Sequence, residues 1–188
     1  MSRALDFPAE RNRLIFATRK GIGMPIAGLL YWIGVAILLR ALPLRSALIA
    51  SFVLTGPVFP IGAMLTRLAG GDLFAKSPHL TQLGMLLAAV QLFYWPVIVI
   101  VFNHAVEWTP LVLALLFGSH FLPYAWVYRS AGYATLAVLT TVVLSVAALV
   151  SGGPIVREAP LLAAACYLVA VAMLWVEVRR IPAPASPG

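Results

Sequence analysis

The stretch LVLALLFGSHFLPYAWVYRS, residues 111–130, decides the fold of this chain. It begins as an apolar run, continues through a histidine, a proline and two tyrosines, and ends beside an arginine. A bilayer core of about 30 Å requires roughly 20 predominantly apolar residues in one helix. The stretch therefore predicts a transmembrane helix that carries polar side chains near its centre.

Composition extends this prediction to the whole chain. Of 188 residues, 62% are hydrophobic and 10% are charged, whereas soluble domains have about 25% charged residues. Apolar runs of similar length recur, which predicts an all-α, polytopic membrane bundle in one domain, 21–180, between an N-terminal segment, 1–20, and a flexible C-terminal tail, 181–188. The predicted spans are 22–42, 47–67, 81–102, 110–128, 133–151 and 160–178.

The placement of arginine and lysine predicts the orientation, because cytoplasmic segments of membrane proteins are enriched in both. With six spans, one side collects ten basic residues and the other side collects only Arg40, Arg45 and Arg157. We therefore expect both termini to lie in the cytoplasm. The net charge of +7 is spread over several segments on this side, which favours anionic lipid rather than nucleic acid as its partner.

The chain also contains a candidate internal repeat. A shift of 62 residues places LTGPVFPIGAMLTRLAG, 54–70, over LFGSHFLPYAWVYRSAG, 116–132, with identities at seven of 17 positions. This pattern indicates a helical hairpin that is used repeatedly, with its copies parallel. Chance similarity between apolar helices remains the alternative.

Prolines predict interrupted helices in the middle of the membrane. Pro57 and Pro60 lie in the second span, Pro96 in the third and Pro123 in the fourth. Each proline removes one backbone hydrogen bond and frees the carbonyl four residues earlier, and in lipid that carbonyl requires another partner. The freed carbonyls are those of Val53, Gly56, Leu92 and Ser119.

Spacing brings polar side chains onto shared helix faces. His120, Pro123 and Tyr124 form one stripe, and Gln91, Tyr94 and Trp95 form another. Counted at 1.5 Å per residue, both stripes and Pro60 lie at a similar depth. We therefore predict a ligand-binding cavity formed by these residues: His120, Tyr124, Gln91, Tyr94, Trp95, Pro123 and Pro60. The alternative is that His120 only links helices through a hydrogen bond.

Other chemistry is not indicated by the sequence. His104 and Glu107 are too few for a metal site, the single Cys166 is interpreted as a packing residue, and no catalytic carboxylate pair or nucleophile motif occurs. Glu177 is expected to pair with Arg180, three residues later. The sequence predicts neither a metal nor a cofactor.

The motifs GSHFLPYAWVYRSAGY and LFYWPV resemble a family of uncharacterised bacterial multipass membrane proteins with a Gly-Ala-His-Phe-Phe-Pro-Tyr-x-Trp-x-Tyr signature. The similarity covers roughly residues 50 to 135. Ser119, Leu122 and Trp95 depart from the family pattern. The matching positions are Gly118, His120, Phe121, Pro123, Tyr124, Trp126 and Tyr128, with Gln91 and Pro96 in the preceding helix. The resemblance implies a bacterial inner membrane and no particular reaction.

Three functions remain open from the sequence. The favoured one is binding or permeation of a small neutral or amphiphilic solute, since the predicted cavity contains no fixed charge. The second is a structural or assembly subunit of a membrane complex without a ligand. The third is a membrane-embedded enzyme that uses His120 as a general base. The bilayer is the expected partner, and a homo-oligomer is also open.

Overall fold

The computed structural model describes residues 7–77 and 80–181, and the elements assigned there are helical. Six of them, or runs of them, are long and apolar enough to cross a membrane. The all-α bundle predicted from the sequence is therefore confirmed, and the protein is a multi-pass membrane protein. The helices are α1 (Phe7–Thr18), α2 (Gly23–Ala41), α3 (Leu44–Leu68), α4 (Leu80–Val90), α5 (Trp95–His104), α6 (Thr109–Ser119), α7 (Leu122–Val127), α8 (Ala131–Ser151) and α9 (Glu158–Arg179), with short 3-10 turns η1 (Arg19–Gly21), η2 (Gln91–Tyr94) and η3 (Val106–Trp108).

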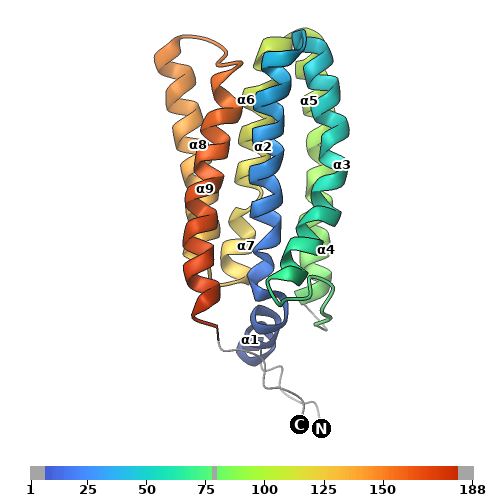
Figure 1. The fold of residues 1–188 in the computed structure, drawn as a ribbon, viewed down its shortest axis with the longest axis vertical. Coiled ribbons are helices and arrows are strands. Elements are labelled where there is room, and N and C mark those ends of the chain that lie inside the picture. Colours follow the sequence, from blue (N-terminus) through green and yellow to red (C-terminus); the bar gives the residue numbers. More distant parts are fainter. Residues whose placement is uncertain (1–6, 78–79, 182–188) are drawn as a thin grey trace.

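The spans run alternately up and down the bundle (Figure 1). Three of them are composite: α1 and η1 precede α2 in the first, α4, η2 and α5 form the third, and η3, α6 and α7 form the fourth. With α2 alone compared with the first predicted span, each observed boundary lies within four residues of the predicted one. Short turn segments connect the spans, and their Gly, Pro and Ser residues end one helix and begin the next, as at Gly152, which has a left-handed φ of 68°.

Helix α2 occupies the centre of the bundle. It packs on one side against α3 and on the other against α9, which in turn packs against α8. Small residues permit these close approaches. A Cβ added to Gly23 would lie 2.1 Å from the Gly62 carbonyl of α3, and a Cβ added to Gly28 would lie 2.3 Å from the Tyr167 ring of α9. By contrast, Leu80 is the only buried residue of α4, so this helix lies at the edge of the bundle.

Helix α1 was not predicted from the sequence. It lies across one end of the bundle, close to the end of α9 (Figure 1), and the chain turns into α2 through Lys20, which has a left-handed φ of 55°. We call this the basic end; it comprises α1, residues 69–77, residues 128–130 and the end of α9. Residues 182–188 of the predicted tail lie outside the described residues.

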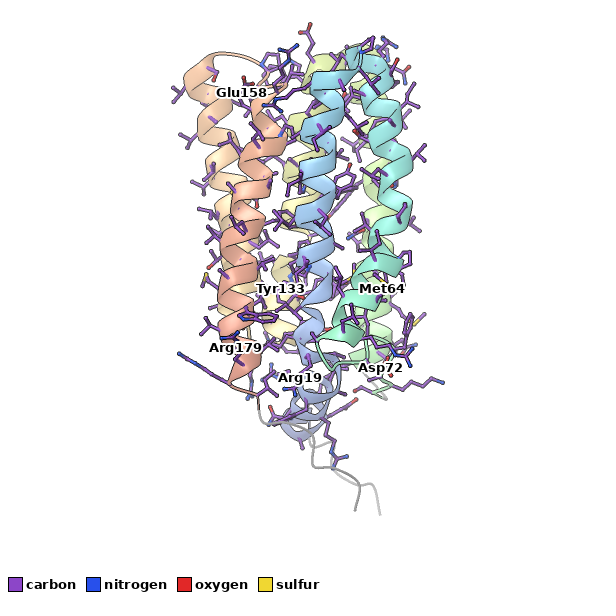
Figure 2. The ribbon with its side chains drawn as sticks, in the orientation of Figure 1. Arg19, Met64, Asp72, Tyr133, Glu158 and Arg179 are labelled. Atoms are coloured by element: carbon purple, nitrogen blue, oxygen red, sulfur yellow. The ribbon has the colours of Figure 1, made fainter. Side chains whose placement is uncertain are left out.

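A buried ion pair closes the basic end. Lys20 Nζ lies 2.7 Å from Glu177 Oε2 and donates a second hydrogen bond to the Arg129 carbonyl. Glu177 also accepts from the Gly132 backbone N–H at 3.0 Å. The expected pairing of Glu177 with Arg180 is therefore wrong: the turn at Lys20 brings a nearer cation to the carboxylate. Arg19, Asp72 and Arg179 lie at this end, opposite Glu158 (Figure 2).

The prolines act differently in the three helices that contain them near mid-depth. Helix α3 continues through Pro57 and Pro60, and both rings are exposed on its surface. Pro96 follows the 3-10 turn η2, and Pro123 lies in the first turn of α7, just after the chain leaves α6. Interruption is thus observed in the third and fourth spans and not in the second.

Candidate ligand-binding cavity

His120 lies at the interruption between α6 and α7, where the helical hydrogen-bond pattern changes. The Phe121 N–H donates to the Gly118 carbonyl, three residues back, rather than to Phe117. The Phe117 carbonyl is therefore released from its helix. This is two residues earlier than Ser119, the carbonyl that the proline argument identified.

Two side chains form hydrogen bonds with the released carbonyl oxygen. His120 Nδ1 lies 2.6 Å from the Phe117 oxygen, and the Tyr167 hydroxyl of α9 donates to the same oxygen at 3.0 Å. Because a carbonyl oxygen only accepts, His120 Nδ1 carries the hydrogen. The neutral ring therefore keeps the Nε2 lone pair available for another donor.

A cavity of about 830 Å³ lies beside this interruption. Its walls come from α2, α3, α4, η2, α6 and α7, with single side chains from α5, α8 and α9, and its floor comes from α1 and residues 73–76. The walls are mainly apolar and aromatic. A volume of this size is within the range of ligand sites, about 300–1,000 Å³.

The cavity does not extend along the whole bundle. Its lining residues belong to the basic half of the helices, up to Trp32, Trp95 and Phe117. Beyond that depth the interior is filled by fully buried residues such as Val35 and Leu113. The structure therefore contains a pocket and not an open channel.

The structure brings four of the predicted site residues together. His120, Tyr124, Gln91 and Trp95 line the cavity, and Trp95 is held against α3 by an edge-on contact with Phe52, with ring centroids 5.5 Å apart. The rings of His120 and Tyr124 also meet edge-on, at 6.2 Å. Gln91 and Trp95 belong to the third span, and His120 and Tyr124 belong to the fourth. The two stripes identified from spacing therefore meet at the cavity.

The other three predicted residues do not line the cavity. Pro60 and Pro123 are exposed, and Tyr94 is half-buried against the hydrophobic core. The stripe argument assumed an uninterrupted α-helix, whereas Tyr94 lies in a 3-10 turn and Pro123 lies beyond the break at His120. Each irregularity changes the angle between neighbouring side chains.

Sequence reasoning missed the contribution of the first and last spans. Tyr31 and Trp32 of α2, Tyr133 of α8 and Tyr167 of α9 all line the cavity. The Tyr31 hydroxyl is buried and has no hydrogen-bond partner among the described residues. The pair Tyr31-Trp32 was visible in the sequence, but no motif indicated that α2 would lie opposite α6.

Among the described residues, the cavity lining contains no carboxylate. Lys76 is the one charged residue of that described lining, and it is exposed at the floor. No cluster of three or more potential metal ligands occurs within residues 7–77 and 80–181. His104 is exposed at the opposite end, Cys166 is buried as a free thiol, and His79 lies outside the described residues.

Comparison with known proteins gives a family and nothing more specific. A family model described as a family of unknown function, DUF7010, matches residues 7–177. The chain belongs to this family. For DUF7010 the match covers every membrane span and all the cavity residues, which is consistent with the resemblance to an uncharacterised family. No curated protein and no solved structure matches the chain.

Proposed function

We propose that this protein binds a small neutral or amphiphilic molecule in the cavity beside His120. The observation that carries the proposal is a set of polar groups that line an otherwise apolar cavity without partners. Among the described residues, none forms a hydrogen bond with His120 Nε2, the Tyr124 hydroxyl or the Gln91 carboxamide. Unsatisfied polar groups at membrane depth are costly, and a ligand that pairs with them removes this cost.

The lining favours an uncharged ligand. An ion that moved from water into this cavity would lose its hydration and meet no opposite charge, apart from Lys76 at the floor. Aromatic rings provide the remaining contacts. Phe121 stacks on Tyr133, with ring centroids 5.6 Å apart, and meets Tyr167 edge-on at 5.8 Å, which gives this part of the wall a rigid aromatic surface.

We also propose a transporter-like role, in which the ligand crosses the membrane when the filled half of the bundle opens. A binding site at mid-depth beside discontinuous helices is the arrangement used by many secondary transporters. The cavity lies in the basic half of the bundle, and buried residues fill the other half, as one state of an alternating cycle requires. The resemblance to bacterial membrane proteins and the excess of basic residues support a bacterial inner membrane with the basic end in the cytoplasm.

Binding can be tested by thermal unfolding of the full chain in lipid nanodiscs. The panel consists of oleyl alcohol, decylubiquinone, indole and glycerol, with oleate and choline as charged comparators. We expect an uncharged member to raise the unfolding midpoint of the wild type, and this shift to disappear in His120→Phe and Tyr124→Phe. The matched control is His104→Gln, because that histidine is exposed at the other end of the bundle.

Two results would overturn the proposal. One is the absence of any midpoint shift across the panel. The other is a shift of equal size in the wild type and both cavity variants. If the chain instead purifies in a fixed ratio with another membrane protein and binds no panel member, the role of assembly subunit is the correct one.

A further inference from the structure

One wall of the cavity is open toward the membrane. The backbones of α3 and α4 hardly approach each other, although both helices line the cavity. Phe59 of α3 is 50% exposed, and Met85 of α4 and Leu92 of η2 are 68% and 69% exposed. These apolar side chains line the cavity and are also largely exposed, and we take this wall as the side that opens toward the bilayer.

No side chain fills the gap between these helices at Gly84. A Cβ added there would meet no atom within 4 Å, so the glycine is not required for close packing inside this chain. Glycine in a helix is less favourable than alanine by about 1 kcal/mol. Gly84 therefore leaves open space where a larger side chain would stand.

The other sides of the cavity differ from the α3–α4 side. On the α7 side, Val127 and Tyr128 are buried and Tyr124 is partly buried. At the floor, the Asp72 N–H donates to the Ala17 carbonyl at 2.7 Å, and Ser77 bonds to Glu10, which fastens α1 beneath the cavity. Phe74 and Lys76 are exposed at the floor, so that side carries a charge, whereas the α3–α4 side is apolar.

The deep end of the cavity selects a hydroxyl group. His120 Nε2 can only accept a hydrogen bond, because Nδ1 already holds the hydrogen. The Tyr124 hydroxyl, which forms no hydrogen bond among the described residues, has a hydrogen to donate. A hydroxyl group both donates and accepts, so a single one can donate to His120 Nε2 and accept from Tyr124.

We propose that the ligand is a single-chain amphiphile with an uncharged, hydroxyl-bearing head group, which reaches His120 from the bilayer between α3 and α4. The head group lies between His120 and Tyr124, and the apolar chain leaves past Phe59 and Met85. This inference rests on the proposed binding function and specifies its ligand and route. Transfer of an uncharged hydroxyl through hydrocarbon costs far less than transfer of a charge, which makes the membrane route accessible to such a molecule.

The head group is tested with chain-matched probes. Oleyl alcohol carries the hydroxyl, oleyl methyl ether has a methyl group in place of the donated hydrogen, and oleate adds a charge. We expect oleyl alcohol to bind the full chain in nanodiscs at least tenfold more tightly than the ether or oleate. His120→Phe should reduce the affinity for the alcohol to that for the ether. Equal affinities for alcohol and ether in the wild type overturn the assignment of the hydroxyl.

The route is tested with a photoreactive C18 alcohol that carries a diazirine at mid-chain. Adducts on Phe59, Met85 or Leu92 that excess oleyl alcohol removes are the expected result. Competed adducts on Trp126 of α7, or on Leu14 and Lys76 at the floor, overturn the α3–α4 route.

A pair of glycine variants separates a blocked gap from general damage. Gly84→Trp places an indole in the gap and should weaken alcohol binding at least tenfold. Gly56→Trp is the matched control, because Gly56 also has no neighbour within 4 Å but does not line the cavity. Equal binding by both variants overturns the route.

If another panel member binds through His120 while oleyl alcohol does not, this inference fails and the proposed function stands. If no panel member binds, both the inference and the proposed function fail.

Discussion

His120 and Tyr167 lie on different spans and donate hydrogen bonds to the same oxygen, the carbonyl of Phe117, at 2.6 and 3.0 Å. The first bond stays within the interrupted fourth span, and the second ties this span to α9. A backbone group that the break releases from its helix is thereby satisfied twice. The interruption beside the cavity is accordingly a fixed feature of the bundle.

The shared carbonyl predicts non-additive losses of stability. His120→Phe or Tyr167→Phe alone leaves one donor, so each should lower the free energy of unfolding by about 1 kcal/mol or less. The double variant leaves the oxygen without a donor and should lose about 1–3 kcal/mol more than the sum of the single losses. A double-mutant cycle of unfolding in mixed micelles measures this coupling; strictly additive losses would show that the two bonds are independent.

The ion pair at the basic end predicts an asymmetry between its partners. Each partner keeps one backbone hydrogen bond when the other is replaced: Lys20 keeps the bond to the Arg129 carbonyl, and Glu177 keeps the bond from the Gly132 N–H. Lys20 is the less exposed side chain, at 10% against 20%, so its charge is the more costly one to leave without a counter-ion. We expect Glu177→Gln to lower stability by about 3 kcal/mol, the lower end for breaking a buried pair, and Lys20→Met to lower it less.

The double variant Lys20→Met/Glu177→Gln provides the control for this asymmetry. It removes both charges, so it should be more stable than Glu177→Gln alone. Unfolding followed by pulse proteolysis compares the three variants. A double variant that is weaker than either single one would contradict an ion pair as the source of the effect.

Helix crossings predict contrasting effects of the same substitution. Gly23→Ala would place a methyl group 2.1 Å from the Gly62 carbonyl and 2.3 Å from the Thr66 nitrogen, both on α3. It should force α2 and α3 apart and lower the yield of folded protein severalfold. Gly84→Ala meets nothing and should be neutral or stabilising by up to about 1 kcal/mol. Size-exclusion yield and thermal midpoint of both variants check this, and equal effects would be inconsistent with the crossing.

The distribution of basic residues predicts the orientation of the bundle. A reporter fused after Gly188 should report the cytoplasmic side. A second reporter inserted next to Glu107, between α5 and α6, should report the opposite side. Reversed signals from the two reporters would place the basic end outside the cell.

The sequence predicted the spans well because in a bilayer the length of an apolar run determines the length of the helix. The sequence also identified His120, Tyr124, Gln91 and Trp95 as residues that line a cavity, since polar side chains in such runs avoid lipid and gather inside the protein. The misplaced Pro60 shows the limit of this reasoning. Proline marks a site where a helix can break, but α3 continues through it with the ring on its surface.

What the sequence could not supply is which spans are neighbours. Tyr31 and Tyr167 reach the cavity because α2 packs on α9 through Gly28, a contact between the two ends of the membrane domain. Lys20 and Glu177 are likewise distant in the sequence and adjacent in the fold, whereas local spacing had paired Glu177 with Arg180. Six nearly parallel helices can be arranged in many ways, and only tertiary packing selects one of them.

The distance along the chain between Lys20 and Glu177 has a consequence for biosynthesis. The two residues are 157 positions apart. At a synthesis rate of about 5–20 residues per second, Lys20 is therefore made roughly 8–31 s before its counter-ion, Glu177. During that interval the ammonium group must remain at the lipid–water interface. The turn into α2 therefore reaches its final position only when α9 has been inserted, and a product that stalls before α9 exposes an unpaired lysine that distinguishes it from the finished protein.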